Sequence, residues 1–118
     1  MSARSILFVD DEPKVLAALK DLLRSKRHEW DMRFAVGAEE ALRELERRPA
    51  EAVVTDLRMS GIRGTTLLAL LEAWHPTARR IVLSGHVRAD RSSRDAHRAH
   101  EVLQKPCDPE ALVRAIEG

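Results

Sequence analysis

The sequence has a single cysteine, Cys107, and almost no excess of charge of either sign. One cysteine excludes a disulfide bond within the chain and is typical of proteins kept in a reducing compartment. The formal net charge is +1, whereas domains that bind nucleic acid usually carry a marked basic excess. We therefore expect a cytoplasmic protein that makes no direct contact with nucleic acid.

Long apolar runs are missing as well. No stretch approaches the roughly 18 apolar residues of a transmembrane helix, and the start, MSARSILFVDDEP, lacks the pattern of a cleavable signal peptide. No internal repeat, low-complexity tract or linker divides the chain. The 118 residues, of which 44% are hydrophobic and 33% charged, predict one globular domain over residues 1–118 with no membrane segment.

Short apolar segments alternate with helical patterns along the chain. The predicted strands lie at residues 6–9, 30–36, 53–54, 81–83 and 101–104. Uninterrupted apolar runs such as ILFV are typical of parallel strands that are buried on both faces. The alternating segment WDMRFAV instead indicates a strand near the edge of a sheet, and EVLQ is the weakest of the five.

Helical periodicity fills the intervals between these strands. Apolar residues recur on one helical face at residues 15–23 and 38–45, and two more helices are predicted at 64–76 and 108–118. Asp108 is the expected N-cap of the last helix. Residues 87–99 contain one large apolar residue, Val87, so that helix should be short or loosely packed.

The alternation predicts an α/β fold. Five parallel strands with right-handed crossovers form a doubly wound sheet that carries helices on both faces. In such sheets ligands bind beyond the carboxyl ends of the strands, close to the point where the strand order reverses.

Chemically active side chains follow the predicted strands at this edge. The first strand ends at Asp10 and Asp11, the third at Asp56 and the fourth at Ser84, while Lys105 follows the fifth. Each has an ordinary explanation taken singly, as a helix cap, a turn residue or a surface lysine. Their occurrence at equivalent strand ends favours one common site.

This set of groups suits phosphoryl chemistry. Mg²⁺ takes oxygen ligands, usually one or two carboxylates with waters and a phosphate oxygen. An aspartate oxygen can attack a phosphoryl group as a nucleophile, while a metal ion and a lysine neutralise the transferring charge. A serine hydroxyl can donate a hydrogen bond to the product.

Four runs of this sequence resemble receiver domains of two-component response regulators, the CheY-like family. They are ILFVDDEP, VVTDLRMSGIRG, RIVLSGH and LQKPCDPEAL, in that order and at the family's spacing. The stretch KRHEWDMRFAVGAEEAL, with HEVLQKPCD, resembles more narrowly the receivers that precede HDOD or HD-type output domains. The resemblance implies a flavodoxin-like fold with five strands in the order 2-1-3-4-5.

The resemblance also assigns roles to particular residues. Asp56 would be the phosphoacceptor, Ser84 the switch hydroxyl and Lys105 the cation that binds the phosphoryl group, with a cis bond between Lys105 and Pro106. Mg²⁺ would be held by Asp10, Asp11, Asp56 and the backbone carbonyl of Arg58. Asp11 would be the more direct ligand of the two paired acids.

The same resemblance implies partners. A sensor histidine kinase or a phosphotransfer protein would donate the phosphoryl group, and the domain would assist only its own phosphorylation and dephosphorylation rather than act as an enzyme. An output domain of HDOD or HD type is expected downstream. A homodimer is expected through the face formed by residues 87–99, 101–104 and 108–118.

Several positions depart from the family pattern. Ser60 replaces a frequent proline, and Val102 replaces an aromatic residue that commonly turns inward on activation, which makes the usual coupling to Ser84 doubtful. Arg58 and His86 flank the site and are expected either to control water access or to be ordinary surface residues.

Other polar residues have simpler explanations. His97 and His100 lack a third ligand at helical spacing and do not indicate a metal site. The arginines at 79, 80, 88, 91, 94 and 98 are expected on a solvated or partner-facing surface.

Two other functions are compatible with the sequence. One is a scaffold or dimerisation domain that keeps the receiver fold but works without phosphorylation, for which Val102 and the polar segment 87–99 are the motive. The other is a metal-dependent phosphohydrolase with Asp56 as nucleophile, which is disfavoured because no cap domain or substrate pocket is evident.

Overall fold

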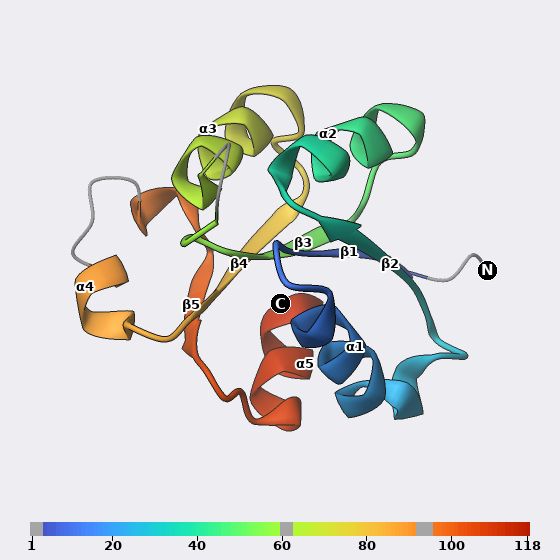
Figure 1. Cartoon of the computed structure of the whole chain (residues 1–118). Coiled ribbons are helices and arrows are strands. Elements are labelled where there is room, and N and C mark those ends of the chain that lie inside the picture. Colours follow the sequence, from blue (N-terminus) through green and yellow to red (C-terminus); the bar gives the residue numbers. More distant parts are fainter. Residues whose placement is uncertain (1–3, 60–62, 92–95) are drawn as a thin grey trace.

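The computed structural model describes residues 4–59, 63–91 and 96–118 and contains one sheet of five parallel strands in the order β2-β1-β3-β4-β5. Helices α1 and α5 cover one face of this sheet, and α2 and α3 cover the other (Figure 1). The predicted fold class and strand order are both confirmed.

The elements follow the predicted alternation closely. The strands are β1 (Arg4–Asp10), β2 (Trp30–Val36), β3 (Ala52–Asp56), β4 (Arg79–Ser84) and β5 (Glu101–Gln104). The helices are α1 (Pro13–Leu22), α2 (Ala38–Arg47), α3 (Gly64–Trp74), α4 (Val87–Arg91) and α5 (Pro109–Glu117), with 3₁₀ turns η1 (Arg24–Lys26) and η2 (Ala96–Arg98). As predicted, the segment around Val87 forms a short helix.

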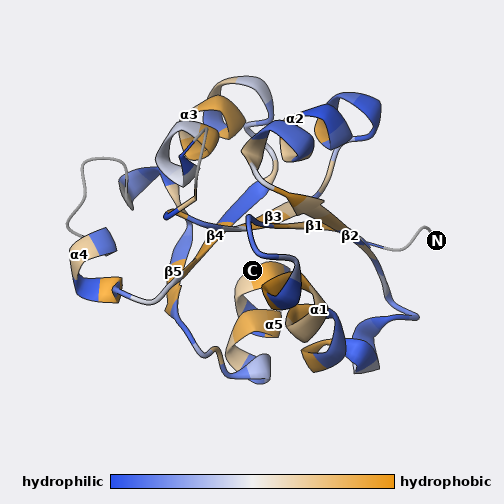
Figure 2. Ribbon diagram, in the orientation of Figure 1, coloured by the Kyte–Doolittle hydropathy of each residue, from blue (hydrophilic) through white to orange (hydrophobic). Residues whose placement is uncertain are grey.

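The central strands are apolar because both faces of the sheet are covered. On β1, Ile6 and Phe8 point into the cluster under α1 and α5, while Leu7 and Val9 point into the cluster under α2 and α3. Hydrophobic colouring accordingly runs along the central strands and over the sheet-facing sides of the helices (Figure 2). The continuous run ILFV is therefore a direct consequence of the two-layered covering.

The core under α4 is much smaller. A separate buried cluster consists of Leu57, Leu68, Val82 and Val102. The partly buried Val87 packs against it. Val87 is the only large apolar residue of α4, so burial stabilises this helix less than its neighbours. Polar contacts consequently have a larger share in fixing its position.

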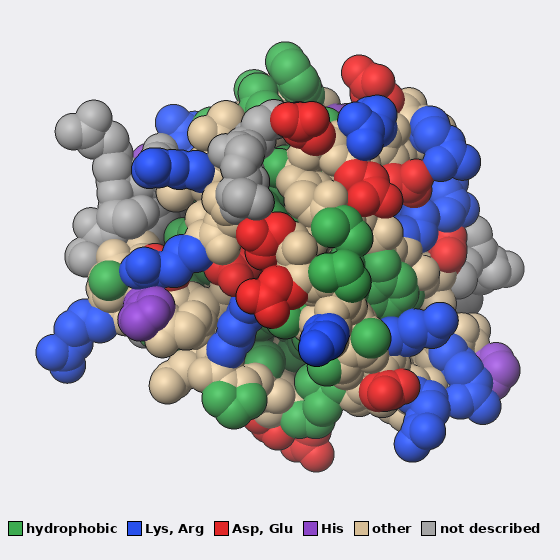
Figure 3. Space-filling model, in the orientation of Figure 1, with side chains coloured by type: hydrophobic (Ala, Val, Ile, Leu, Met, Phe, Trp, Pro, Cys, Tyr) green, Lys and Arg blue, Asp and Glu red, His purple; other side chains and the backbone are tan. Residues whose placement is uncertain are grey.

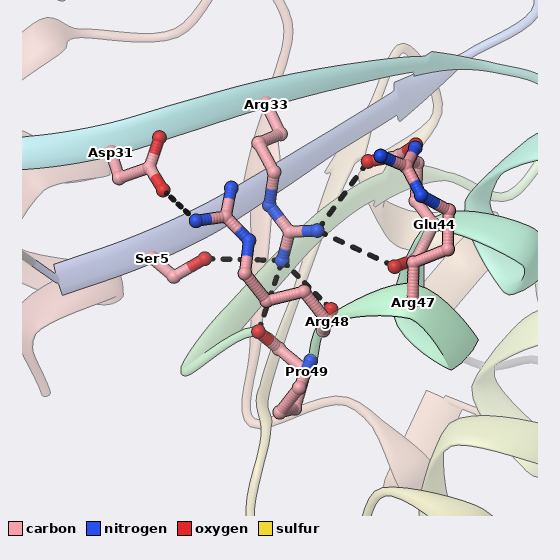
Figure 4. A network of polar contacts seen from close by, with 7 residues as sticks. All are labelled: Ser5, Asp31, Arg33, Glu44, Arg47, Arg48 and Pro49. Carbon is pink, nitrogen blue, oxygen red and sulfur yellow. Dashed lines mark hydrogen bonds and ion pairs between the residues drawn. The ribbon is translucent and has the colours of Figure 1, made fainter.

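One half-buried arginine holds the end of α2 against the sheet edge. Arg33 on β2 donates to the backbone carbonyls of Arg48 at 3.1 Å and Pro49 at 3.0 Å, to Ser5 Oγ at 3.1 Å and to Glu44 Oε1 at 3.4 Å (Figure 4). Its positive charge also lies at the negative end of the helix dipole. Arg33 therefore ties α2 to β1 and β2 at the end of the sheet remote from the predicted site.

Candidate functional site

The carboxyl ends of four strands meet at one edge of the sheet and bring the predicted site residues together. Asp10 and Asp56 are the last residues of β1 and β3, Ser84 is the last residue of β4, and Lys105 follows β5 directly. Acidic side chains gather near the middle of this face with basic side chains around them (Figure 3). The predicted site residues meet because the carboxyl ends of parallel strands lie at the same edge of the sheet.

Lys105 joins the two carboxylates. Its Nζ lies 2.8 Å from Asp56 Oδ2 and 3.3 Å from Asp10 Oδ2. The side chain of Asp10 is 5% exposed and that of Asp56 is 16% exposed. A shared ammonium ion thus offsets the repulsion of two carboxylates that are largely withdrawn from water.

The charge on Lys105 is well maintained. Burial opposes this charge, but the hydrogen bond that Lys105 donates to Asp56 and the charges of Asp56 and Asp10 outweigh burial and raise the pKa of Lys105 above its ordinary value. The lysine is therefore protonated throughout the physiological range. It provides a permanent positive charge beside Asp56.

Asp10 also prepares the start of α1. Its Oδ1 accepts a hydrogen bond of 3.0 Å from the backbone N–H of Glu12. Glu12 occupies the N-cap position before Pro13, but its own side chain makes no capping hydrogen bond among the described residues. Glu12 is therefore the N-cap by position alone, and Asp10 satisfies the free N–H just before the helix.

Both oxygens of Asp56 are engaged. Oδ1 accepts a hydrogen bond of 2.9 Å from the backbone N–H of Arg58, and Oδ2 contacts Lys105. These two donors fix the orientation of the carboxylate.

A glycine that the sequence pattern did not single out lies directly behind Asp56. A Cβ added at Gly64, the first residue of α3, would overlap the backbone of Asp56 and Leu57. The close approach of α3 to the end of β3 therefore requires glycine at this position. The sequence signals were its place at the start of the predicted helix 64–76 and at the end of the run VVTDLRMSGIRG.

The donors at this edge fit a magnesium ion in part. Asp10 and Asp56 direct oxygens toward a common neighbour, Lys105, and Asp11 is half-buried next to Asp10. No three Asp, Glu, His or Cys side chains of the described residues are arranged so that they could hold a metal. Mg²⁺ does not need such a set, because one or two carboxylates, waters and a phosphate oxygen are its usual ligands.

Ser84 is fully buried, but its hydroxyl points to a residue that the sequence did not indicate. The hydroxyl donates a hydrogen bond to Asp90 Oδ2 and accepts one of 2.9 Å from the backbone N–H of His86. Asp90 lies on α4 and is 6% exposed. The sequence does not distinguish Asp90 from a surface charge, because it is an acid in a polar helix six residues after Ser84.

Arg58 reaches the same buried acid. Its guanidinium lies 3.5 Å from Asp90 Oδ1, while its backbone N–H binds Asp56. One residue therefore contacts both the predicted phosphoacceptor and α4.

The departures from the family pattern lie around this region. Val102 is buried in the small cluster with Leu57 and Val82, so no ring is available there to follow Ser84. Ser60 lies outside the described residues. The bond between Lys105 and Pro106 is cis, as expected.

Among the basic residues, Arg80 does not match the prediction. It was expected at the surface with the other arginines, but it is 9% exposed and donates to the backbone carbonyls of Arg98, Pro76 and Ala78. Its own backbone N–H donates to His100 Nδ1 at 2.9 Å. Arg80 is a structural residue that joins β4 to the segment preceding β5.

Cys107 has no features of a reactive thiol. Burial, and next the neighbouring charge of Asp108, raise its pKa above the ordinary value. A raised pKa keeps the thiol protonated and poorly nucleophilic.

Residues 6–117 match the response regulator receiver domain family. The chain belongs to this family. It is a receiver domain of two-component signal transduction, and the sequence-based prediction of the family is confirmed.

Two curated relatives illustrate the match to this receiver domain. It is 32% identical over 113 residues to the transcriptional regulatory protein GlrR of Escherichia coli (strain K12), covering 95% of this chain and 25% of GlrR. It is 30% identical over 122 residues to the nitrogen assimilation regulatory protein NtrX of Azorhizobium caulinodans, covering 98% of this chain and 26% of NtrX. The chain thus spans about a quarter of the length of these relatives.

Solved receiver structures agree. The signal receiver domain of an HD domain-containing protein from Pseudomonas fluorescens Pf-5 has a TM-score of 0.85 at 27% identity, covering 98% of this chain and 93% of that one. The response regulator TrrA from Thermotoga maritima, solved with Mg²⁺-BeF, has a TM-score of 0.85 at 25% identity, covering 97% and 96%. In the described part of this receiver domain, no helix is long and apolar enough to cross a membrane.

Proposed function

We propose that Asp56 of this receiver domain accepts a phosphoryl group from a phosphohistidine of a sensor kinase or phosphotransfer protein. The observation that carries the proposal is the placement of Asp56, whose oxygens are oriented by the Arg58 N–H and by Lys105 at the converging strand ends. Family membership supports the same role.

The chemistry is an in-line transfer. An oxygen of Asp56 attacks the phosphorus, the phosphorus–nitrogen bond of the phosphohistidine breaks, and the imidazole leaves with the electron pair of that bond. Lys105 releases its contact with Asp56 Oδ2 and turns to an oxygen of the transferred group. Its raised pKa ensures that it does so as a cation.

Mg²⁺ would be held by one or two carboxylates from the set Asp10, Asp11 and Asp56 and by the Arg58 carbonyl, with waters and a phosphate oxygen as its other ligands. When bound, the ion supplies charge neutralisation to the transferring phosphoryl oxygens. Asp10 keeps one oxygen on the Glu12 N–H, which leaves the other, now on Lys105, for the ion.

An apolar groove beside the site suits the donor protein. Val15, Ala18 and Leu22 of α1 line it together with Pro106, and Lys14 and Lys105 lie along it. Because Lys105 borders both the groove and Asp56, a partner helix seated there would carry its histidine close to the acceptor. The two lysines would attract a phosphorylated partner.

The output of the switch is a second part of the proposal. The likeness to a receiver from an HD domain-containing protein supports an HD-type output domain, whereas GlrR and NtrX are named as regulators of transcription and of nitrogen assimilation. We propose an HDOD or HD-type output that responds to the α4–β5–α5 face, with a homodimer through the same face.

The phosphoacceptor role is tested with acetyl phosphate and Mg²⁺. The wild-type protein should gain the mass of one phosphoryl group, and Asp56→Ala should gain none, as measured by intact mass spectrometry. Asp31→Ala, which changes an aspartate on β2, is the control and should react like the wild type. Equal reaction of Asp56→Ala and the wild type would refute the proposal.

A further inference from the structure

The hydroxyl of Ser84 donates its hydrogen bond to Asp90 and not toward Asp56, where a phosphoryl group would be bound. A serine hydroxyl has one hydrogen to donate, and in this structure it goes to Asp90. The other contact of the hydroxyl, from the His86 N–H, is one that it accepts. Ser84 cannot donate to a phosphoryl group on Asp56 until it leaves Asp90.

Asp90 depends on two residues that a phosphoryl group on Asp56 would also attract. Its Oδ2 accepts from Ser84, and its Oδ1 lies 3.5 Å from the guanidinium of Arg58. Its side chain is 8% exposed, and a buried carboxylate that loses its partners is strongly destabilised. An aspartyl phosphate carries close to two negative charges where the carboxylate of Asp56 carried one, and its phosphoryl oxygens compete for both donors.

We propose that Asp90 is a positioning residue that holds α4 in its unphosphorylated place through Ser84 and Arg58, a set of contacts that we call the α4 latch. Phosphorylation of Asp56 draws the Ser84 hydroxyl and the Arg58 guanidinium away from Asp90. The carboxylate, left without these donors and repelled by the new charge, moves toward water and takes α4 with it.

The α4 latch accounts for two other features of the molecule. The apolar core under α4 is small, so loss of the polar contacts is sufficient to move the helix. Val102 offers no aromatic ring to carry the change from Ser84, and Asp90 provides a different connection between the same serine and the face formed by α4 and β5. The inference rests on the proposed phosphorylation of Asp56 and adds the means by which that event is transmitted.

The test uses Mg²⁺ with beryllofluoride as a stable substitute for the phosphoryl group. Asp90→Ala frees Ser84 in advance, so it should bind beryllofluoride about tenfold more tightly than the wild type, since a charge-assisted hydrogen bond is worth a factor of this order. Asp90→Asn keeps the shape and a weaker acceptor, and its affinity should lie between the two. Asp21→Asn, an exposed aspartate on α1, should match the wild type.

Two further measurements distinguish loss of the α4 latch in Asp90→Ala from a general structural effect of the substitution. The backbone amide signals of α4 in free Asp90→Ala should move toward those of the beryllofluoride-bound wild type. In a Ser84→Ala background, Asp90→Ala should no longer tighten binding, because the competition for the hydroxyl has been removed.

The outcomes are distinct. If the wild type binds beryllofluoride but Asp90→Ala and Asp90→Asn bind it equally or more weakly, with unmoved α4 signals, the α4 latch is refuted and the proposed function stands. If the wild type neither binds beryllofluoride nor becomes phosphorylated, both proposals fail.

Discussion

Lys105 lies between two carboxylates that would otherwise repel each other across the end of the sheet. Its contacts of 2.8 Å with Asp56 and 3.3 Å with Asp10 make this ammonium ion a competitor of Mg²⁺ as well as an aid to phosphoryl transfer. Lys105 therefore controls whether the charges of Asp10 and Asp56 are neutralised by the protein itself or by a bound Mg²⁺.

Replacing this lysine should strengthen metal binding. Lys105→Met leaves the charges of Asp10 and Asp56 without their cation, so we expect Mg²⁺ to bind several-fold more tightly at low ionic strength. Calorimetric titration with Mg²⁺ measures the change, and Lys14→Met, an exposed lysine nearby, should alter the affinity little. A weaker affinity in Lys105→Met would contradict this account of the site.

His100 should make folding sensitive to acid. Burial, and next the charges of Arg80 and Arg79, lower the pKa of His100 below the ordinary value of 6.5. Its Nδ1 accepts a hydrogen bond from the Arg80 N–H. The stabilisation is complete above pH 6.5, where both states are neutral, and is lost as the pH falls below 6.5 and the unfolded chain binds the proton first.

Denaturant unfolding between pH 7.5 and about pH 5 measures this contribution. His100→Asn keeps an acceptor near the position of Nδ1 and does not titrate, so its stability should fall less on acidification than that of the wild type. His75→Asn, in the loop after α3, should retain the wild-type slope. Equal slopes for the wild type and His100→Asn would show that His100 is not the sensor.

Among the elements, α2 and α3 depend on single close contacts at their ends. Arg33 binds the carbonyls at the end of α2, and Gly64 lets α3 start against the backbone of Asp56. The first contact concerns stability, since it is remote from the site. The second concerns function, since it fixes the strand end that carries the proposed phosphoacceptor.

Removing the guanidinium of Arg33 should destabilise the domain. Arg33→Met removes the donor that joins the carbonyls of Arg48 and Pro49 to Ser5 and Glu44, and we expect a loss of about 1–3 kcal/mol in the free energy of unfolding. Arg47→Met, which removes an exposed arginine from the same cluster, should cost less than about 1 kcal/mol. Urea unfolding of the two variants gives the comparison, and equal losses would contradict the role of Arg33.

A methyl group at Gly64 should disturb the site. Gly64→Ala forces α3 and the end of β3 apart, so we expect a loss of about 1–3 kcal/mol in stability and slower phosphorylation by acetyl phosphate. Gly85→Ala is the matched control, because a Cβ there meets no atom within 4 Å. Wild-type stability and rate in Gly64→Ala would show that the close approach is unimportant.

For the whole molecule, the alternation of buried runs and helical stripes was sufficient to predict the parallel sheet and the edge at which Asp10, Asp56, Ser84 and Lys105 meet, whereas the strand order was predicted from the resemblance to receiver domains. Contacts that depend on side-chain direction were not predictable in the same way. Asp90 and Arg80 look like surface charges in a polar stretch, and their burial depends on how α4 and β5 close over β4.

The central claim is that Asp56 is phosphorylated, and chemical trapping of the acyl phosphate tests it most directly. Borohydride reduces an aspartyl phosphate to homoserine, which peptide mass spectrometry can locate in the sequence. After reaction with acetyl phosphate and Mg²⁺, the account predicts homoserine at position 56 and at no other aspartate. Homoserine at position 10 or 11 would contradict this claim. So would the absence of homoserine after treatment with acetyl phosphate, Mg²⁺ and borohydride.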